Sequence, residues 1–170
     1  MKLDNFIRDI PDFPKKGIIF KDITPLLKDA GAFSKMIDEL AAMYRGVKID
    51  KIVSMESRGF IIGAALAIKL GCGFIPVRKK GKLPYKTIRQ EYQLEYGTDI
   101  LEIHKDCVEE GENVLIADDV LATGGTAQAV CELIGKLNAN IVGLCFLIEL
   151  KFLNGRDKLK KYKVNSLIEY

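Results

Sequence analysis

Apolar residues along the chain fall into short continuous runs that alternate with stretches of helical period. Continuous apolar runs are typical of strands buried on both faces of a parallel sheet, and spacing at i, i+3, i+4 and i+7 is typical of amphipathic helices. These patterns predict strands at 51–55, 73–77, 114–117 and 140–150, and helices at 33–44, 59–70 and 130–137. Because 51–77 is strand, helix, strand, the predicted fold class is α/β, with a twisted parallel sheet flanked by helices.

Weaker patterns lie at the N-terminus and in the middle of the chain. Leu3–Arg8 is predicted as a short helix, and the prolines at 11, 14 and 25 then favour an extended, turning segment. Tyr92–Tyr96 and Ile100–His104 alternate enough to predict a hairpin that turns near Gly97.

Composition and charge narrow the class of protein. A chain of 170 residues, 48% apolar and 29% charged, is typical of one soluble globular domain, which we expect to span 1–170. The net charge of +3, from 26 basic and 23 acidic residues, is too small to imply a nucleic-acid partner. The polar N-terminal residues and the lack of a long apolar run predict neither a signal peptide nor a membrane span, so the expected location is the cytoplasm.

Cysteine and histidine are too scattered to predict a structural zinc site. Cys131 and Cys145 lie in apolar segments and are interpreted as core thiols in a reducing compartment. The residues concerned are Cys72, Cys107, Cys131, Cys145 and His104, and we assign His104 no role.

The stretch 114–127 joins a strand, an acidic pair, a small-residue loop and a helix. Asp118 and Asp119 follow the apolar run, at the end of a strand where open α/β sheets bind ligands, and two adjacent carboxylates suit a vicinal diol. The small residues leave successive amides free to converge on an anion at a helix start: Ala122, Thr123, Gly124, Gly125 and Thr126. One anion and one diol predict ribose 5-phosphate. The alternative is a helix cap followed by an ordinary turn.

A second anion site is predicted at Ser57-Arg58-Gly59, between the strand at 51–55 and the next helix. Gly59 lets backbone approach closely, and Arg58 can donate two charge-assisted hydrogen bonds to a phosphate. The alternative is a helix cap by Ser57 with Arg58 in solvent.

From Arg78 to Glu91 the chain has no clear period, and a loop of about 14 residues is long enough to suspect a lid. Its cations could close over a bound diphosphate: Arg78, Lys79, Lys80, Lys82, Lys86 and Arg89. A solvated basic face is the usual explanation of such a run, but beside two anion-binding loops we favour the lid.

Together these motifs resemble one family. Val114–Ala127 is similar to the phosphoribosyl-diphosphate signature of the type I phosphoribosyltransferases, and the whole chain resembles the adenine-specific members of that family from end to end. Five further blocks match in the family's order: 10–14, 17–25, 56–60, 78–84 and 94–97. Blocks in register are much more specific than a single motif.

The resemblance implies a small N-terminal hood over about residues 1–30 and a flexible lid loop at 78–91. It implies that 56–59 binds pyrophosphate, often with a non-proline cis peptide, here between Glu56 and Ser57. It also implies that Lys82 reaches the pyrophosphate, and that Arg78 does so from the neighbouring subunit of a homodimer. Tyr85 stands where some relatives have glycine, and Glu56 is aspartate in some members.

At the base end, the resemblance implies that Phe20 and Leu150 sandwich adenine and that backbone near Ile19 reads its hydrogen-bonding edge. Glu95 would handle a proton on the purine, although by pattern alone it is an exposed strand residue. Lys21 is expected beside the base where some members have arginine, and as a point charge it cannot reproduce the planar fork of arginine.

The implied reaction converts adenine and 5-phosphoribosyl 1-diphosphate to AMP and pyrophosphate, with Glu95, Arg58 and Lys82 as catalytic residues. The transition state resembles an oxocarbenium ion, so positioning and electrostatics should dominate. Mg²⁺ is the expected cofactor, carried mainly by substrate oxygens and reached by Asp118 and Asp119 through water rather than by direct protein ligands.

Two alternatives stay open at the level of sequence. The base could be hypoxanthine, guanine, xanthine or orotate, because the sugar and phosphate loops do not report base identity. The chain could also be a regulator that senses the diphosphate, which would require a DNA-reading module. The segment before Lys51 is short, broken by prolines and already matched to the hood, so we expect neither a nucleic-acid nor a membrane partner.

Overall fold

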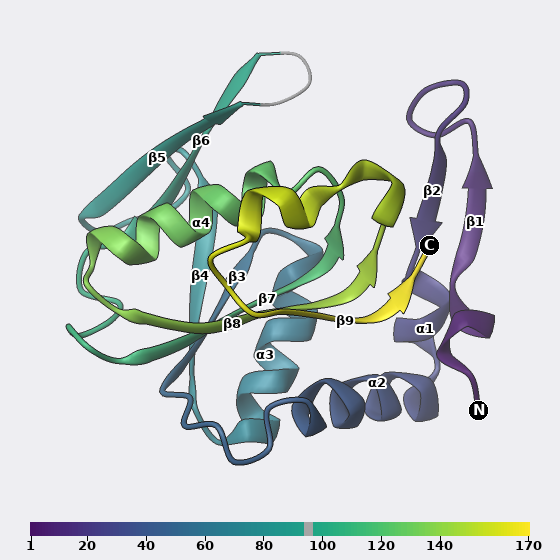
Figure 1. Cartoon of the computed structure of the whole chain (residues 1–170), viewed down its shortest axis with the longest axis horizontal. Helices are drawn as coiled ribbons and strands as arrows, with labels where there is room; N and C mark the ends of the chain where they lie inside the picture. The colour runs from purple at the N-terminus through teal and green to yellow at the C-terminus, as the bar shows by residue number, and fades with distance from the viewer. Residues whose placement is uncertain (94–96) are drawn as a thin grey trace.

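The computed structural model describes residues 1–93 and 97–170, and within them a seven-stranded sheet has the order β5-β6-β4-β3-β7-β8-β9 (Figure 1). Five neighbouring strands are parallel: β4 (Gly73–Lys79), β3 (Lys51–Met55), β7 (Asn113–Leu121), β8 (Asn140–Glu149) and β9 (Val164–Glu169). At one edge, β6 (Thr98–His104) and β5 (Thr87–Gln93) pair antiparallel. The predicted mostly parallel α/β sheet is confirmed.

Helices cover both faces of this sheet. On one face lie α1 (Thr24–Lys28), α2 (Ala30–Ala42) and α3 (Arg58–Leu70), and on the other lies α4 (Gly125–Lys136) (Figure 1). Neighbouring residues of the central strands enter opposite cores: Leu115 packs in the cluster of α2 and α3, whereas Ile116 packs in the cluster of α4. Burial on both faces explains why these strands are continuous apolar runs.

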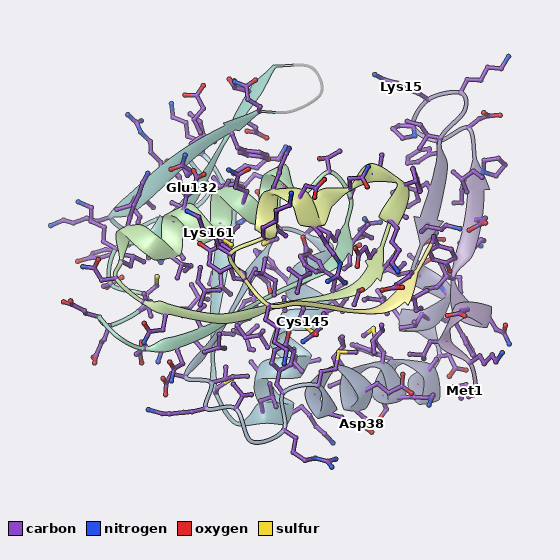
Figure 2. The ribbon with its side chains drawn as sticks, viewed as in Figure 1. Met1, Lys15, Asp38, Glu132, Cys145 and Lys161 are labelled. Atoms are coloured by element: carbon purple, nitrogen blue, oxygen red, sulfur yellow. The ribbon has the colours of Figure 1, made fainter. Side chains whose placement is uncertain are left out.

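The buried thiols fit this arrangement. Cys145 of β8 lies inside the molecule (Figure 2), and Cys131 of α4 is equally enclosed. Burial raises the pKa of both thiols, that of Cys131 to about 12 and that of Cys145 to about 12. Both therefore behave as small core residues. Among the described residues, no helix combines the length and apolar character needed to span a membrane.

The N-terminal residues form a small sheet of their own, in which β1 (Arg8–Pro11) pairs antiparallel with β2 (Ile19–Asp22). In Figure 1, β2 stands beside the end of β9. Only Leu3–Phe6 is helical, as the 3-10 turn η1, so the prediction of a helix to Arg8 is wrong. The reason is tertiary, because the Arg8 side chain donates to Asp22 Oδ2 on the facing strand, at 2.6 Å from Nη2.

The expected 78–91 loop is also wrong in its extent. Arg78 and Lys79 end β4, where they face Glu102 and Leu101 of β6, and 87–91 belongs to β5, so only 80–86 is irregular. The sequence does not predict these strand residues, because many of them are charged and show no apolar pattern. They are in strands because they pair antiparallel with β6. The predicted hairpin is confirmed in that β5 pairs antiparallel with β6, but its first strand was predicted at 92–96 and begins at Thr87. Residues 94–96 lie outside the described part of the chain.

Three elements near the C-terminus had no sequence prediction. They are the 3-10 turns η2 (Lys151–Leu153) and η3 (Gly155–Leu159), and the strand β9. Leu159 is 1% exposed and joins the core around α4. This segment therefore packs as part of the domain rather than as a tail.

Candidate active site

A pocket of about 630 Å³ opens at the carboxyl ends of β3 and β7. These strands are parallel neighbours, so the loops that follow them meet at one edge of the sheet. The pocket brings together most of the residues predicted for the site: Phe20, Lys21, Glu56, Ser57, Arg58, Asp118, Asp119, Ala122, Thr123, Gly124, Gly125, Thr126 and Leu150. The pocket is also lined by Met55 and Phe146, which no sequence motif covers, and by Val120 and Leu121 of the 114–127 stretch, which were given no role.

The small-residue loop runs from the end of β7 into the first turn of α4. Gly124 has a φ of 78°, a left-handed conformation that favours glycine. A β-carbon at Gly124 would also collide with the carbonyl oxygen of Gly155. Residues 122–126 line the pocket at the N-terminal end of the 12-residue helix α4, where the helix dipole is positive.

The acidic pair lies inside β7 rather than after it, because β7 continues to Leu121 beside the long strand β8. Asp119 is only 5% exposed and Asp118 is partly buried. Burial, followed by the neighbouring Asp119 charge, raises the pKa of Asp118 well above its ordinary value. The free site thus holds carboxylates whose negative charge is poorly solvated, and a partner rich in hydroxyls or cations would stabilise them.

Arg58 and Gly59 bring the first turn of α3 against this pair. A β-carbon at Gly59 would come within 2.5 Å of Asp118 Oδ1, so the close approach requires glycine. Arg58 Nε lies 2.6 Å from Asp119 Oδ2, and its guanidinium carbon lies 4.8 Å from the centre of the Phe20 ring. The alternative of a solvated Arg58 with a Ser57 cap is wrong, since in the described structure Ser57 makes no side-chain cap hydrogen bond.

The peptide bond between Glu56 and Ser57 is cis, as the resemblance implied. The Glu56 carboxylate accepts hydrogen bonds from residues of the predicted lid. Arg78 Nη2 and Lys82 Nζ donate to it at 3.0 and 3.1 Å, and the Lys79 amide donates to it at 2.8 Å. Burial acts against ionisation, but these hydrogen bonds outweigh it and lower the pKa of Glu56. Arg78 and Lys82 thus share one carboxylate of the chain, and the three side chains together keep a net positive charge beside the site.

Apolar side chains from the hood and from the segment after β8 also line the pocket: Ile18, Ile19, Phe20 and Leu150. Phe20 stacks edge-on against Phe13, with ring centres 5.2 Å apart, and the Leu150 amide donates to Leu121 O at 2.9 Å. Lys21 Nζ lies 2.7 Å from Asp9 Oδ1 and 3.7 Å from the centre of the Tyr170 ring. Lys21 is therefore held by the hood strand β1 and by the end of β9.

An adjoining cavity of about 580 Å³ shares Ile18, Ile19, Lys21, Thr123 and Leu150 with the first pocket, and is also lined by Phe152, Leu153 and Tyr170.

Glu95 lies outside the described residues, so its role stays a prediction. Among residues 1–93 and 97–170, no group of three or more His, Cys, Asp or Glu side chains could hold a metal ion.

Comparison with known proteins agrees with this geometry. The phosphoribosyl transferase domain model matches residues 25–169, so the fold and the site define a phosphoribosyltransferase. A protein of Geobacter metallireducens named adenine phosphoribosyltransferase is 63% identical over 169 residues, 99% of each chain. Another of that name, from Brachyspira hyodysenteriae, is 61% identical over 100% of each chain. The chain belongs to the adenine phosphoribosyltransferase family.

Solved structures of the same family superpose closely. The adenine phosphoribosyltransferase of Thermoanaerobacter pseudethanolicus is 56% identical with a TM-score of 0.97, covering 99% of this chain and 100% of that one. The Saccharomyces cerevisiae enzyme, solved with D-2,5-dideoxy-2,5-imino-altritol 1,6-bisphosphate and adenine, is 45% identical with a TM-score of 0.92, covering 96% and 95%.

Proposed function

We propose that this pocket transfers the 5-phosphoribosyl group of phosphoribosyl diphosphate to adenine, giving AMP and pyrophosphate in purine salvage. The observation that carries the proposal is the union, in one pocket, of the small-residue loop after β7, the acidic pair and the loop after β3 that holds Ser57 and Arg58. The yeast relative, solved with a bisphosphate and adenine, supports the choice of base.

In the proposed complex, the 5-phosphate lies on the amides of 122–126 with the hydroxyls of Thr123 and Thr126 as further donors. The ribose hydroxyls donate to Asp118 and Asp119. This placement satisfies two carboxylates that burial otherwise penalises. The donor is thus fixed at both ends of its sugar.

The diphosphate lies on the loop 56–59, where Ser57, Arg58 and Gly59 face the acidic pair. Arg58 then exchanges Asp119 for phosphate oxygens, and Lys82 exchanges Glu56 for the same group. Each cation is already held within a few ångströms by a carboxylate. Without substrate these cations pair with carboxylates of the chain. With substrate bound they place positive charge next to the leaving pyrophosphate.

Mg²⁺ fits this donor set as part of the diphosphate substrate. Two neighbouring carboxylates, Asp118 and Asp119, are too few for a protein cage, which suits an ion that keeps its waters and binds mainly phosphate oxygens. When bound, the ion neutralises charge on the departing pyrophosphate. Asp118 and Asp119 would hold its water ligands.

Adenine would lie between Phe20 and Leu150, with backbone near Ile19 and the Lys21 side chain at its edge. In the reaction the bond from ribose C1 to the pyrophosphate oxygen breaks, its electron pair leaves with pyrophosphate, and a bond forms from C1 to purine N9. Glu95 is proposed to take the N9 proton. Positioning of the two reactants supplies most of the rate.

We also propose a homodimer and a cytoplasmic location. An apolar face of α3 points outward, since Ile61 is 43% exposed and Ile68, two turns later, is 84% exposed. A second copy of the chain would bury this face, and the free thiols of all four cysteines support a reducing compartment. Arg78 of the partner subunit would then reach the diphosphate.

The test is an assay of pyrophosphate release from phosphoribosyl diphosphate and Mg²⁺ with each base supplied separately. We expect turnover with adenine and at least about 10³-fold lower kcat/KM with hypoxanthine, guanine or xanthine, because a site that hydrogen-bonds one edge rejects the wrong pattern. Turnover of hypoxanthine in preference to adenine would overturn the base assignment. Diphosphate-sugar binding without release of pyrophosphate would favour a sensor.

A further inference from the structure

The floor of the small-residue loop is the segment between β8 and β9, which none of the sequence motifs covers. Figure 1 shows this segment, in yellow-green, beside α4. A β-carbon at Gly155 would collide with the carbonyl oxygen of Ala122, and it would lie 3.1 Å from the amide nitrogen of Gly124. The two backbones are therefore in direct contact, so the start of η3 lies directly against the loop 122–126.

A partly buried ion pair, with Glu149 enclosed and Arg156 reaching solvent, holds η3 in this position. Arg156 donates from Nε and Nη2 to the two oxygens of Glu149, both at 2.6 Å, and from Nη1 to Val164 O at 2.8 Å. Glu149 is 3% exposed and also accepts from Ser166 Oγ at 2.7 Å. Because Glu149 ends β8 and Val164 begins β9, the pair anchors η3 to both strands.

This anchor directs Lys158 toward the loop. Its Nζ lies 3.7 Å from the position that a β-carbon of Gly125 would occupy, at the first residue of α4. Lys158 is exposed and makes no ion pair with any residue in 1–93 or 97–170. The loop 122–126 itself contains no cationic side chain. An uncommitted ammonium group thus stands beside a cradle built otherwise from neutral donors.

We propose that Lys158 is a phosphate-binding residue of this enzyme, whose ammonium group pairs with the 5-phosphate held on the loop 122–126. The inference rests on the proposed function. A dianionic phosphate gains more from a cation than from amides alone, since charge-assisted hydrogen bonds are about twice as strong as neutral ones. The four-carbon stem of lysine lets the group move onto the phosphate once the ligand is in place.

The test compares Lys158→Gln with Lys161→Gln, which removes the same charge from the same segment, where the chain turns toward β9 (Figure 2). We expect Lys158→Gln to weaken binding of AMP and of ribose 5-phosphate about 10-fold in calorimetry, the loss of one charge-assisted hydrogen bond. The KM for phosphoribosyl diphosphate should rise by a similar factor with kcat within about 2-fold. Lys158→Arg should recover most of the affinity.

Pyrophosphate serves as the internal control, because it binds at the loop 56–59 and carries no 5-phosphate. Its affinity should be the same in wild type, Lys158→Gln and Lys161→Gln. Unchanged AMP affinity in Lys158→Gln, or an equal loss for pyrophosphate, would overturn the inference. Wild-type protein that binds neither AMP nor phosphoribosyl diphosphate would instead contradict the proposed function, so the two failures are distinguishable.

Discussion

Asp118 shows how a single residue can cost stability and serve binding. Its carboxylate is buried beside a second carboxylate, and both effects raise its pKa. A group with a raised folded-state pKa contributes stability that is present below its unfolded pKa, about 3.9, and lost as the pH rises through the folded pKa. At neutral pH the free enzyme therefore bears an electrostatic penalty that a bound ribose would relieve.

Asp118→Asn should remove this penalty. Asparagine keeps Oδ1 as an acceptor for the Asp119 amide, a bond of 2.9 Å, so we expect Tm to rise by about 3 °C at pH 8 and this gain to shrink toward pH 4. The KM for phosphoribosyl diphosphate should rise about 10-fold. Scanning calorimetry across pH checks the change in Tm, with Asp106→Asn as an exposed control. An Asp118→Asn variant less stable than wild type at pH 8 would contradict the proposed electrostatic penalty.

Glu95 is the residue for which function has to be tested most directly. If it takes the purine proton, Glu95→Gln should lower kcat about 10²-fold or more while the KM for phosphoribosyl diphosphate changes little. Glu91→Gln, at an exposed position of β5, is the matched control. A kcat equal to that of wild type would remove Glu95 from the mechanism.

At the scale of elements, the ion pair between Arg156 and Glu149 joins the turn η3 to the end of β8. Burial opposes ionisation of Glu149, but hydrogen bonds from Arg156 and Ser166 outweigh it and lower the Glu149 pKa. The stabilisation is thus present above the unfolded pKa of about 4.3 and is lost as the pH falls through the folded value. Breaking the pair leaves a buried carboxylate without its cation.

Arg156→Ala should lower the free energy of unfolding by about 2–3 kcal/mol at pH 7.5, measured by urea denaturation. This loss lies at or below the lower limit of the range for a fully buried pair, about 3–5 kcal/mol, because the Arg156 side chain is 42% exposed. The loss should diminish below about pH 4.3, and Glu149→Gln added to Arg156→Ala should recover part of it. Lys160→Ala, which breaks only an exposed pair with Asp157, should change stability by less than about 0.5 kcal/mol; an equal loss in both variants would exclude a special role for Arg156.

At the scale of the whole molecule, the proposed dimer depends on the outer face of α3. Ile68→Lys places a charge on the most exposed apolar residue of that face, so we expect sedimentation equilibrium to shift from two chains per particle to one. Activity should fall with dimer content if a partner arginine completes the site. Val47→Lys, an exposed position in the turn after α2, should leave both unchanged. A fully active monomer would contradict the shared site.

The local sequence pattern was sufficient to predict an element where the residues of that element show a clear apolar pattern of their own. The strand 51–55 was predicted residue for residue, the helix after it began one residue early at Arg58, and the cis peptide at Glu56 followed from the resemblance. The prediction of a loop over 78–91 failed because the ends of this segment belong to β4 and β5, which pair with β6. Charged side chains at a sheet edge show no apolar period, so the sequence pattern does not indicate this pairing.

The sequence by itself determined the parallel sheet and the position of the loops 56–59 and 122–126, because apolar periodicity and small residues act within one segment. The family followed from the resemblance of several blocks along the chain. The tertiary structure alone decided that Arg58 pairs with Asp119, that Glu56 holds Arg78 and Lys82, and that Lys158 stands beside Gly125. Those contacts join segments up to about 60 residues apart in the sequence. No local pattern encodes them, since they exist only once the sheet has brought the loops to one edge.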